Sequence, residues 1–143
     1  NLARMSKLPL LVLASDGVIT DTDAPIILGT DGSIPAQTAQ RWFETLVKGG
    51  NPGLALWVSA DQLDDAEHAQ QVLAALENNF EHVSTRQLQG DATEQLVNTA
   101  SEEKAALVII GKRGSTPIQE LLIGSTAESV VRESRQPVLM IPA

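Results

Sequence analysis

The chain has 143 residues, of which 18 are acidic and 10 basic, giving a formal net charge of −8. This length fits one ordinary domain, and the absence of cysteine excludes disulfides, thiolate catalysis and cysteine-held metal sites. The negative charge and the 3% aromatic content argue against nucleic acid, anionic membrane and single-stranded RNA as partners. The chain has neither an apolar run long enough for a transmembrane helix nor a convincing signal peptide, so a cytoplasmic protein is expected.

Short apolar runs alternate with amphipathic stretches along the main body of the chain. Helices are predicted over residues 34–48, 64–79 and 126–134. Another helix is expected to open at Gly90-Asp91, with Leu96, Val97 and Ala100 on its apolar face and with Asp91 and Glu94 suited to cap it. Strands are expected at residues 25–29, 54–58, 83–88, 105–110 and 138–141. The polar strand 83–88 is expected to be partly exposed. The last two strands are continuously apolar, which is typical of strands covered on both faces.

This alternation predicts an α/β fold, a doubly wound five-stranded parallel sheet with helices on both faces, which is a Rossmann-like arrangement. Ligands of such sheets bind outside the carboxyl ends of the strands, near the point where the strand order reverses. Asp64 and His68 lie one helical turn apart and could share a metal, but a third ligand is not evident. A solvated face is the simpler interpretation of this pair.

The N-terminal segment repeats the end of the chain at a fixed offset of 128 residues. The offset pairs the apolar strand 10–13 with 138–141, and it also aligns Arg4 with Arg132, Ser6 with Ser134 and Pro9 with Pro137. Residues 1–14 are therefore predicted to be the last strand of a preceding, similar domain, with residues 15–24 as a linker and 25–143 as the main domain. The alternatives are a chance likeness between two apolar strands and a native start at Met5.

The segment that carries chemistry directly follows the buried strand 105–110. It reads Gly111-Lys112-Arg113-Gly114, then nine residues, then Gly124-Ser125-Thr126. Glycines at a strand end let a ligand approach the backbone closely, and the free N–H groups at a helix start form an anion site with the helix dipole. Residues 1–110 carry 6 basic and 15 acidic side chains (net −9), whereas residues 111–143 carry 4 and 3 (net +1). A phosphate chain is the simplest ligand for such a segment.

Ser125 has a second interpretation. Together with Glu128 it forms a capping box, in which the hydroxyl serves only the stability of the helix. The two roles are compatible, because a hydroxyl can cap the empty helix and meet phosphate in the bound state.

The spacing G-x2-G-x9-G-S after an apolar strand resembles the nucleotide-binding signature of the universal stress protein family. The opening strand and turn 27–33, with Asp31 at the tip, and the closing segments 125–132 and 137–142 are similar to that family as well. The resemblance covers residues 25–142. It implies an adenine nucleotide alpha hydrolase-like fold, a dimer, and ATP as the ligand, with or without Mg²⁺.

The resemblance also implies a role for individual residues. It places the phosphates and ribose against Gly111, Gly114, Gly124 and Ser125, with Thr126 in the same helix start. The nucleoside would lie near Thr30 and Asp31, with Val58 packed beside the adenine. Family members often have a small residue or histidine after the first glycine; Lys112 and Arg113 stand here instead, and either strengthen phosphate binding or are solvated.

Two functions follow as hypotheses. The first is an ATP-binding regulatory domain of a stress response; the alternative is a nucleotide-independent dimerisation or partner-binding scaffold. Slow ATP hydrolysis or autophosphorylation is the most that is expected of an enzyme, since no residue is placed to activate water. The resemblance also implies that last strands pair across a dimer interface, so residues 8–13 are expected to pair antiparallel with residues 137–142 or with a copy of them, in a homodimer or a tandem pseudo-dimer. Such pairing covers an apolar sheet edge that otherwise invites aggregation.

Overall fold

The computed structural model describes residues 9–13, 23–30, 34–59, 66–111 and 125–141. In chain order the elements are β1 (Leu10–Val12), β2 (Ile26–Thr30), α2 (Ile34–Lys48), β3 (Gly53–Ser59), α3 (Ala66–Asn79), β4 (Val83–Gln89), α4 (Ala92–Glu102), β5 (Leu107–Gly111), α5 (Ser125–Glu133) and β6 (Val138–Ile141). The predicted alternation is confirmed, with bounds that differ by at most two residues. None of the helices in the described ranges is long and apolar enough to cross a membrane.

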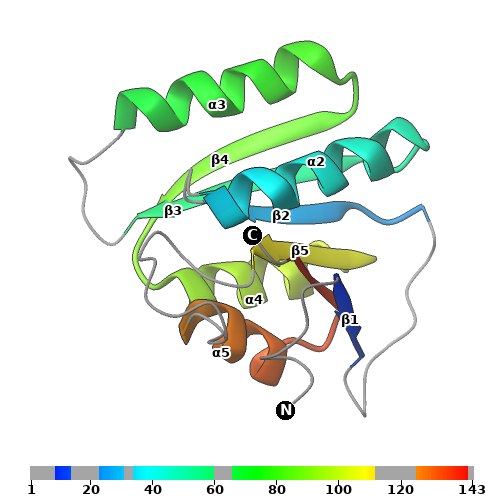
Figure 1. The fold of residues 1–143 in the computed structure, drawn as a ribbon, viewed down its shortest axis with the longest axis vertical. Helices are drawn as coiled ribbons and strands as arrows, with labels where there is room; N and C mark the ends of the chain where they lie inside the picture. Colours follow the sequence, from blue (N-terminus) through cyan, green and yellow to red (C-terminus); the bar gives the residue numbers. More distant parts are fainter. Residues whose placement is uncertain (1–8, 14–22, 31–33, 60–65, 112–124, 142–143) are drawn as a thin grey trace.

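The strands form one sheet in the order β1-β6-β5-β2-β3-β4. The strands from β2 to β6 are parallel to their neighbours, which confirms the doubly wound fold. The sheet has six strands rather than the five of the predicted parallel sheet, because β1 adds an antiparallel strand beside β6. Helices α2 and α3 cover one face of the sheet, and α4 and α5 cover the other (Figure 1).

Helix α2 packs on the sheet through the apolar stripe that its sequence predicts. The stripe residues Ala36, Ala39, Phe43 and Val47 recur at spacings of three and four, and all are buried. At the start of β3, a Cβ built on Gly53 would lie 2.6 Å from Phe43 Cζ and 2.8 Å from Val47 Cγ1. Only glycine therefore lets the strand and the helix approach this closely.

The opposite face is held by α4 and α5. Leu96, Ala100, Ala127 and Val130 from these helices pack with Ile27, Leu56 and Ile110 of the sheet. Asp91 caps α4 as predicted: one carboxylate oxygen accepts a hydrogen bond of 2.9 Å from the backbone N–H of Glu94. This cap satisfies one of the N–H groups that have no partner inside the helix.

Strand β1 lies beside β6 within the chain, as Figure 1 shows, and pairs with it antiparallel in the register Leu10↔Met140, Leu11↔Leu139, Val12↔Val138. The predicted pairing of 8–13 with 137–142 is thus confirmed over the residues that form β1. That residues 1–14 belong to a preceding domain, and 15–24 to a linker, stays a prediction.

Candidate functional site

The strand order reverses between β2 and β5, which are neighbours in the sheet. After β2 the chain passes to α2 on one face, whereas the helix after β5 is α5 on the other (Figure 1). The parallel ladder between these strands ends at Leu28↔Ile109, two residues before the last residue of each strand. At their last residues β2 pairs with β3 through Thr30↔Trp57, and β5 pairs with β6 through Gly111↔Ile141. In open α/β sheets such a reversal point is where ligands bind.

Three of the predicted site residues lie at this carboxyl edge of the sheet. Thr30 ends β2 and is buried, Gly111 ends β5 and is half-buried, and Val58 lies one residue before the end of β3. Val58 is half-buried and packs on the cluster beneath α4 and α5. Because all three belong to parallel strands, the fold brings them to one side of the molecule, as the resemblance implies.

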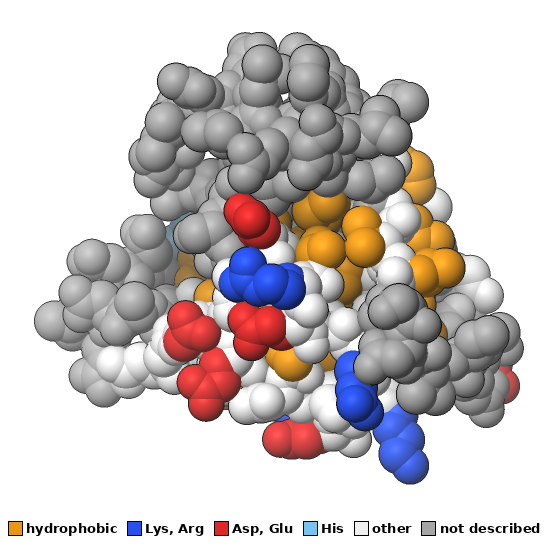
Figure 2. All heavy atoms as spheres, turned by 90° about the horizontal axis from the view of Figure 1, so that it is seen from below, with side chains coloured by type: hydrophobic (Ala, Val, Ile, Leu, Met, Phe, Trp, Pro, Cys, Tyr) orange, Lys and Arg blue, Asp and Glu red, His pale blue; other side chains and the backbone are white. Residues whose placement is uncertain are grey.

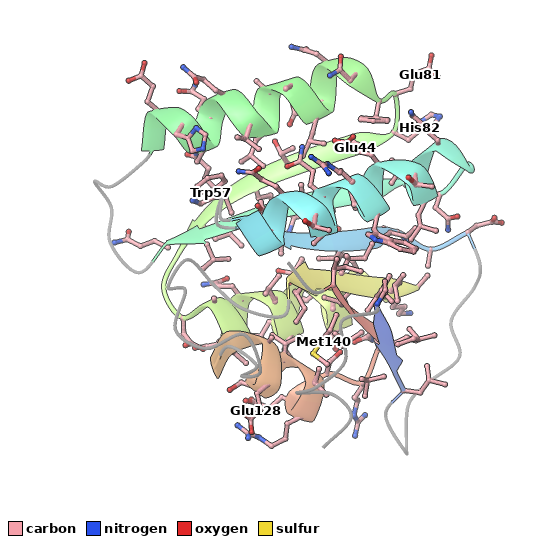
Figure 3. The ribbon with its side chains drawn as sticks, in the orientation of Figure 1. Glu44, Trp57, Glu81, His82, Glu128 and Met140 are labelled. Carbon is pink, nitrogen blue, oxygen red and sulfur yellow. The ribbon has the colours of Figure 1, made fainter. Side chains whose placement is uncertain are left out.

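Helix α5 presents its N-terminus to the same edge. Its C-terminus leads through a short connection into the amino end of β6, where the backbone N–H of Val108 donates to the carbonyl of Pro137. The helix must therefore begin at the opposite, carboxyl edge. Its first residue is Ser125, and the exposed Glu128 in its first turn lies on the side away from the sheet (Figure 3). The free N–H groups at this end, with the helix dipole, favour an anion.

Several predicted site residues lie outside the described residues. These are Asp31, Lys112, Arg113, Gly114 and Gly124, and the side chains of Ser125 and Thr126 are not described either. Their roles stay predictions, as does the choice between a capping and a phosphate-binding role for Ser125.

The fold separates the basic residues of the segment 111–143, which the charge count treated together. Arg132 lies in the last turn of α5, and Arg135 follows in the connection to β6. Both therefore stand at the amino edge of the sheet, away from the strand ends that form the candidate site. The other two basic residues of this segment, Lys112 and Arg113, lie outside the described residues.

One aromatic contact close to the site was not predicted from the sequence. Trp57 is the register partner of Thr30 at the end of β3, and it is buried. Its ring meets that of His68 edge-on, with centroids 5.7 Å apart and an interplanar angle of 89° (Figure 3). His68 thus fastens the start of α3 to the end of β3. The alternation along β3, which turns Ala55 and Trp57 to the same face, was the available signal.

The metal interpretation of Asp64 and His68 receives no support from this contact. Asp64 lies outside the described residues, and His68 turns its ring to Trp57. Within the parts of the chain that the structure describes, no group of three or more His, Cys, Asp or Glu side chains could hold a metal ion.

Comparisons with known proteins find a matching family model and similar proteins. A family model described as "Universal stress protein family" matches residues 44–142. A universal stress protein of Methanocaldococcus jannaschii is 34% identical over 59 residues, which are 41% of this chain and 35% of that protein. The aligned segment thus spans about a third of the length of this relative.

Solved structures show the same architecture. A universal stress protein of Archaeoglobus fulgidus superposes with a TM-score of 0.82 at 22% identity, covering 99% of this chain and 53% of its own. Another structure from that organism, described as a complex with dAMP, has a TM-score of 0.63 at 20% identity. It covers 87% of this chain and 99% of its own. At these identities the structures bear on the fold alone. The family match extends over well more than half of the sequence, and the chain therefore belongs to the universal stress protein family.

Proposed function

We propose that the chain binds an adenine nucleotide at the carboxyl edge of the sheet, between the ends of β2, β3 and β5 and the start of α5. The observation that carries the proposal is the reversal of the strand order between β2 and β5, at the edge of the sheet where Thr30 and Gly111 end these strands and α5 begins. Ligands of open α/β sheets bind at such a reversal point, and the helix start favours their phosphates.

Solved relatives of the same fold support an adenine nucleotide as the ligand. One structure is described as a universal stress protein in complex with cAMP, and another from Archaeoglobus fulgidus as a complex with dAMP. For this chain we propose ATP, with or without Mg²⁺, as the nucleotide, and the segment from Gly111 to Thr126 as the cradle of its phosphates. The bound domain would act as a regulatory module of a stress response.

Binding is tested on protein from which nucleotide has been removed by unfolding and refolding. ATP, AMP, cAMP and adenosine are compared by calorimetry and thermal unfolding, each with and without Mg²⁺. A ligand at one hundred times its Kd stabilises the folded state by about 2.7 kcal/mol, which raises the Tm by several degrees. No heat and no shift with any of them at millimolar concentration would refute the proposal.

Two variants separate the phosphate cradle from the nucleoside site. Gly111→Val places a branched side chain at the end of β5 and should weaken every nucleotide, whereas the double variant K112A/R113A should weaken ATP more than adenosine. Ser84→Val, on the exposed edge strand β4, is the control and should bind normally. If adenosine binds as tightly as ATP to the unaltered chain, the proposed role of the segment 111–126 is wrong, although nucleoside binding stands.

The alternative function, a nucleotide-independent scaffold, is favoured by one observation. Leu11, Leu13 and Trp42 expose apolar surface on the described part of the chain. Light scattering with and without ATP distinguishes the two functions. An assembly state that forms equally without nucleotide, in a chain that binds none, would favour the scaffold.

A further inference from the structure

Gly29 and Ile110 lie one residue below the edge of the candidate site. Gly29 precedes Thr30, which ends β2, and Ile110 precedes the last residue of β5. Ile27 and Ile110 pack in the cluster beneath α4 and α5. Because side chains alternate along a strand, position 29 faces the same side as Ile27. The layer directly beneath the proposed nucleotide site therefore has no side chain at the end of β2.

Leu96 of α4 fills the space that a side chain at position 29 would take. A Cβ built on Gly29 would lie 2.9 Å from Leu96 Cδ2, 3.0 Å from Leu96 Cδ1 and 3.3 Å from Ile110 Cγ2. Both methyl groups of Leu96 thus lie against the bare backbone of β2, and the side chain is buried. Glycine at position 29 is what lets α4 come this close to the strand.

The side chain of Leu96 leans toward the candidate site. Helix α4 follows β4, which ends at the carboxyl edge of the sheet, so α4 begins at that edge. Helical side chains point toward the N-terminus of their helix. On the other side of Leu96, Ala100 and Ile27 fill the same cluster and are fully buried. A displaced Leu96 side chain must therefore move toward the site or push α4 away from the sheet.

The layer that contains Leu96 is apolar. Val58, which the resemblance places beside the adenine, packs on the same cluster as Leu96. Charged side chains of α5, among them Glu128 and Arg132, are exposed instead, and acidic and basic groups are seen on this side of the molecule in Figure 2. An apolar layer offers phosphates neither charge nor hydrogen bonds. It suits the nucleoside part of a nucleotide.

We propose that Gly29 is a positioning residue of the nucleotide site. Without a side chain it lets Leu96 settle against β2, and the height of Leu96 sets the apolar layer on which the nucleoside rests. The inference rests on the proposed nucleotide site. Gly29 acts through Leu96, so its replacement weakens the binding of the nucleoside part and has no separate effect on the phosphates.

Two substitutions test this role by moving one carbon atom between positions 29 and 96. Gly29→Ala adds a carbon, Leu96→Val removes one from the side chain that it meets, and the double variant keeps the total. Gly29→Ala should weaken adenosine and ATP by the same factor, about tenfold, because a binding site needs its supporting groups within about 0.5 Å. The double variant should regain most of the affinity, since exchanges that conserve volume are tolerated best.

Affinities are measured by calorimetry on nucleotide-free protein, at a temperature where circular dichroism shows each variant to be folded. Leu76→Val is the matched control, because Leu76 is equally buried in the cluster on the opposite face, near the end of α3. It should lower the stability and leave both affinities unchanged. Leu96→Val alone should weaken both ligands by about two- to threefold, which tests the proposal even if Gly29→Ala does not fold.

Three results would overturn the proposal. One is a folded Gly29→Ala variant that binds both ligands as tightly as the unaltered chain does. Another is an equal loss of affinity in Leu76→Val, which would make the loss a consequence of lower stability. The third is a loss for ATP alone, which would place the layer under the phosphates. In all three the nucleotide site itself stands, whereas an unaltered chain that binds neither ligand refutes the proposed function as well.

Discussion

Gly29, just before the end of β2, lies where the strand backbone approaches α4. A Cβ at this position would lie 2.9 Å from Leu96 Cδ2, 3.0 Å from Leu96 Cδ1 and 3.3 Å from Ile110 Cγ2. Ordinary contacts between carbon atoms are about 3.5–4.0 Å, so Gly29→Ala must displace the Leu96 side chain. Leu96 is buried at 3% exposure and has little space in which to move.

The expected cost follows from two opposing effects. Overpacking a filled core lowers the free energy of unfolding by about 1–3 kcal/mol, whereas alanine restricts the unfolded chain and returns about 0.4–1 kcal/mol. Gly29→Ala should therefore destabilise the fold by about 1–2 kcal/mol. Leu96→Ala alone removes a buried side chain and should cost about 2–5 kcal/mol.

The double variant separates the clash from other effects of the glycine. Once Leu96 is alanine, the two shortest contacts of the added methyl group are gone and the 3.3 Å approach to Ile110 Cγ2 remains, so Gly29→Ala should become nearly neutral. The coupling energy in the double-mutant cycle should thus be about 1–3 kcal/mol. Urea denaturation followed by tryptophan fluorescence and far-UV circular dichroism measures it, provided that the two signals coincide.

A coupling below about 0.5 kcal/mol would mean that the two sites are independent, and the reasoning from the Leu96 contact would then be wrong. Ser84→Ala, on the exposed edge strand, is the control and should change the stability by no more than about 0.5 kcal/mol.

Three further predictions use the same denaturation assay. Asp91→Ala should cost about 1 kcal/mol and Asp91→Asn much less; equal losses would contradict the capping hydrogen bond. Leu13→Ala should change the stability by at most about 0.5 kcal/mol, whereas Ile141→Ala should cost about 2–5 kcal/mol, because Leu13 is exposed and Ile141 is buried. Similar costs would contradict this difference in burial. Arg86→Ala removes an exposed 3.2 Å ion pair with Glu103, should cost at most about 1 kcal/mol, and should cost less in 1 M salt.

Local patterns predicted the elements well because each signal was carried by neighbouring residues. The apolar stripe of α2 and the glycines after Lys48 defined the bounds that the structure shows, Ile34–Lys48. The polar sequence of β4 predicted a partly exposed strand, and β4 lies at the edge of the sheet. The β1–β6 pairing was predicted from the repeat together with the pairing of last strands that the family resemblance implies.

Contacts between distant elements were not predictable in this way. Alternation along β3 shows that Ala55 and Trp57 share a face, but it does not show that Trp57 contacts His68 of α3. The charge count treated residues 111–143 as one basic region, although the fold carries Arg132 to the edge opposite the candidate site. Distances along the chain do not reveal these separations, because a helix and the strand after it run in opposite directions.

The antiparallel sense of the β1–β6 ladder has a consequence for how two domains would work together. Across such a ladder the strands of one half point up while those of the other point down, so the carboxyl edges of the two halves open at opposite ends of one continuous sheet. In the two-domain arrangement that the repeat predicts, a single small ligand could not bridge the two proposed sites. Each site would face its own surroundings, and a partner that recognises one occupied site would leave the other accessible.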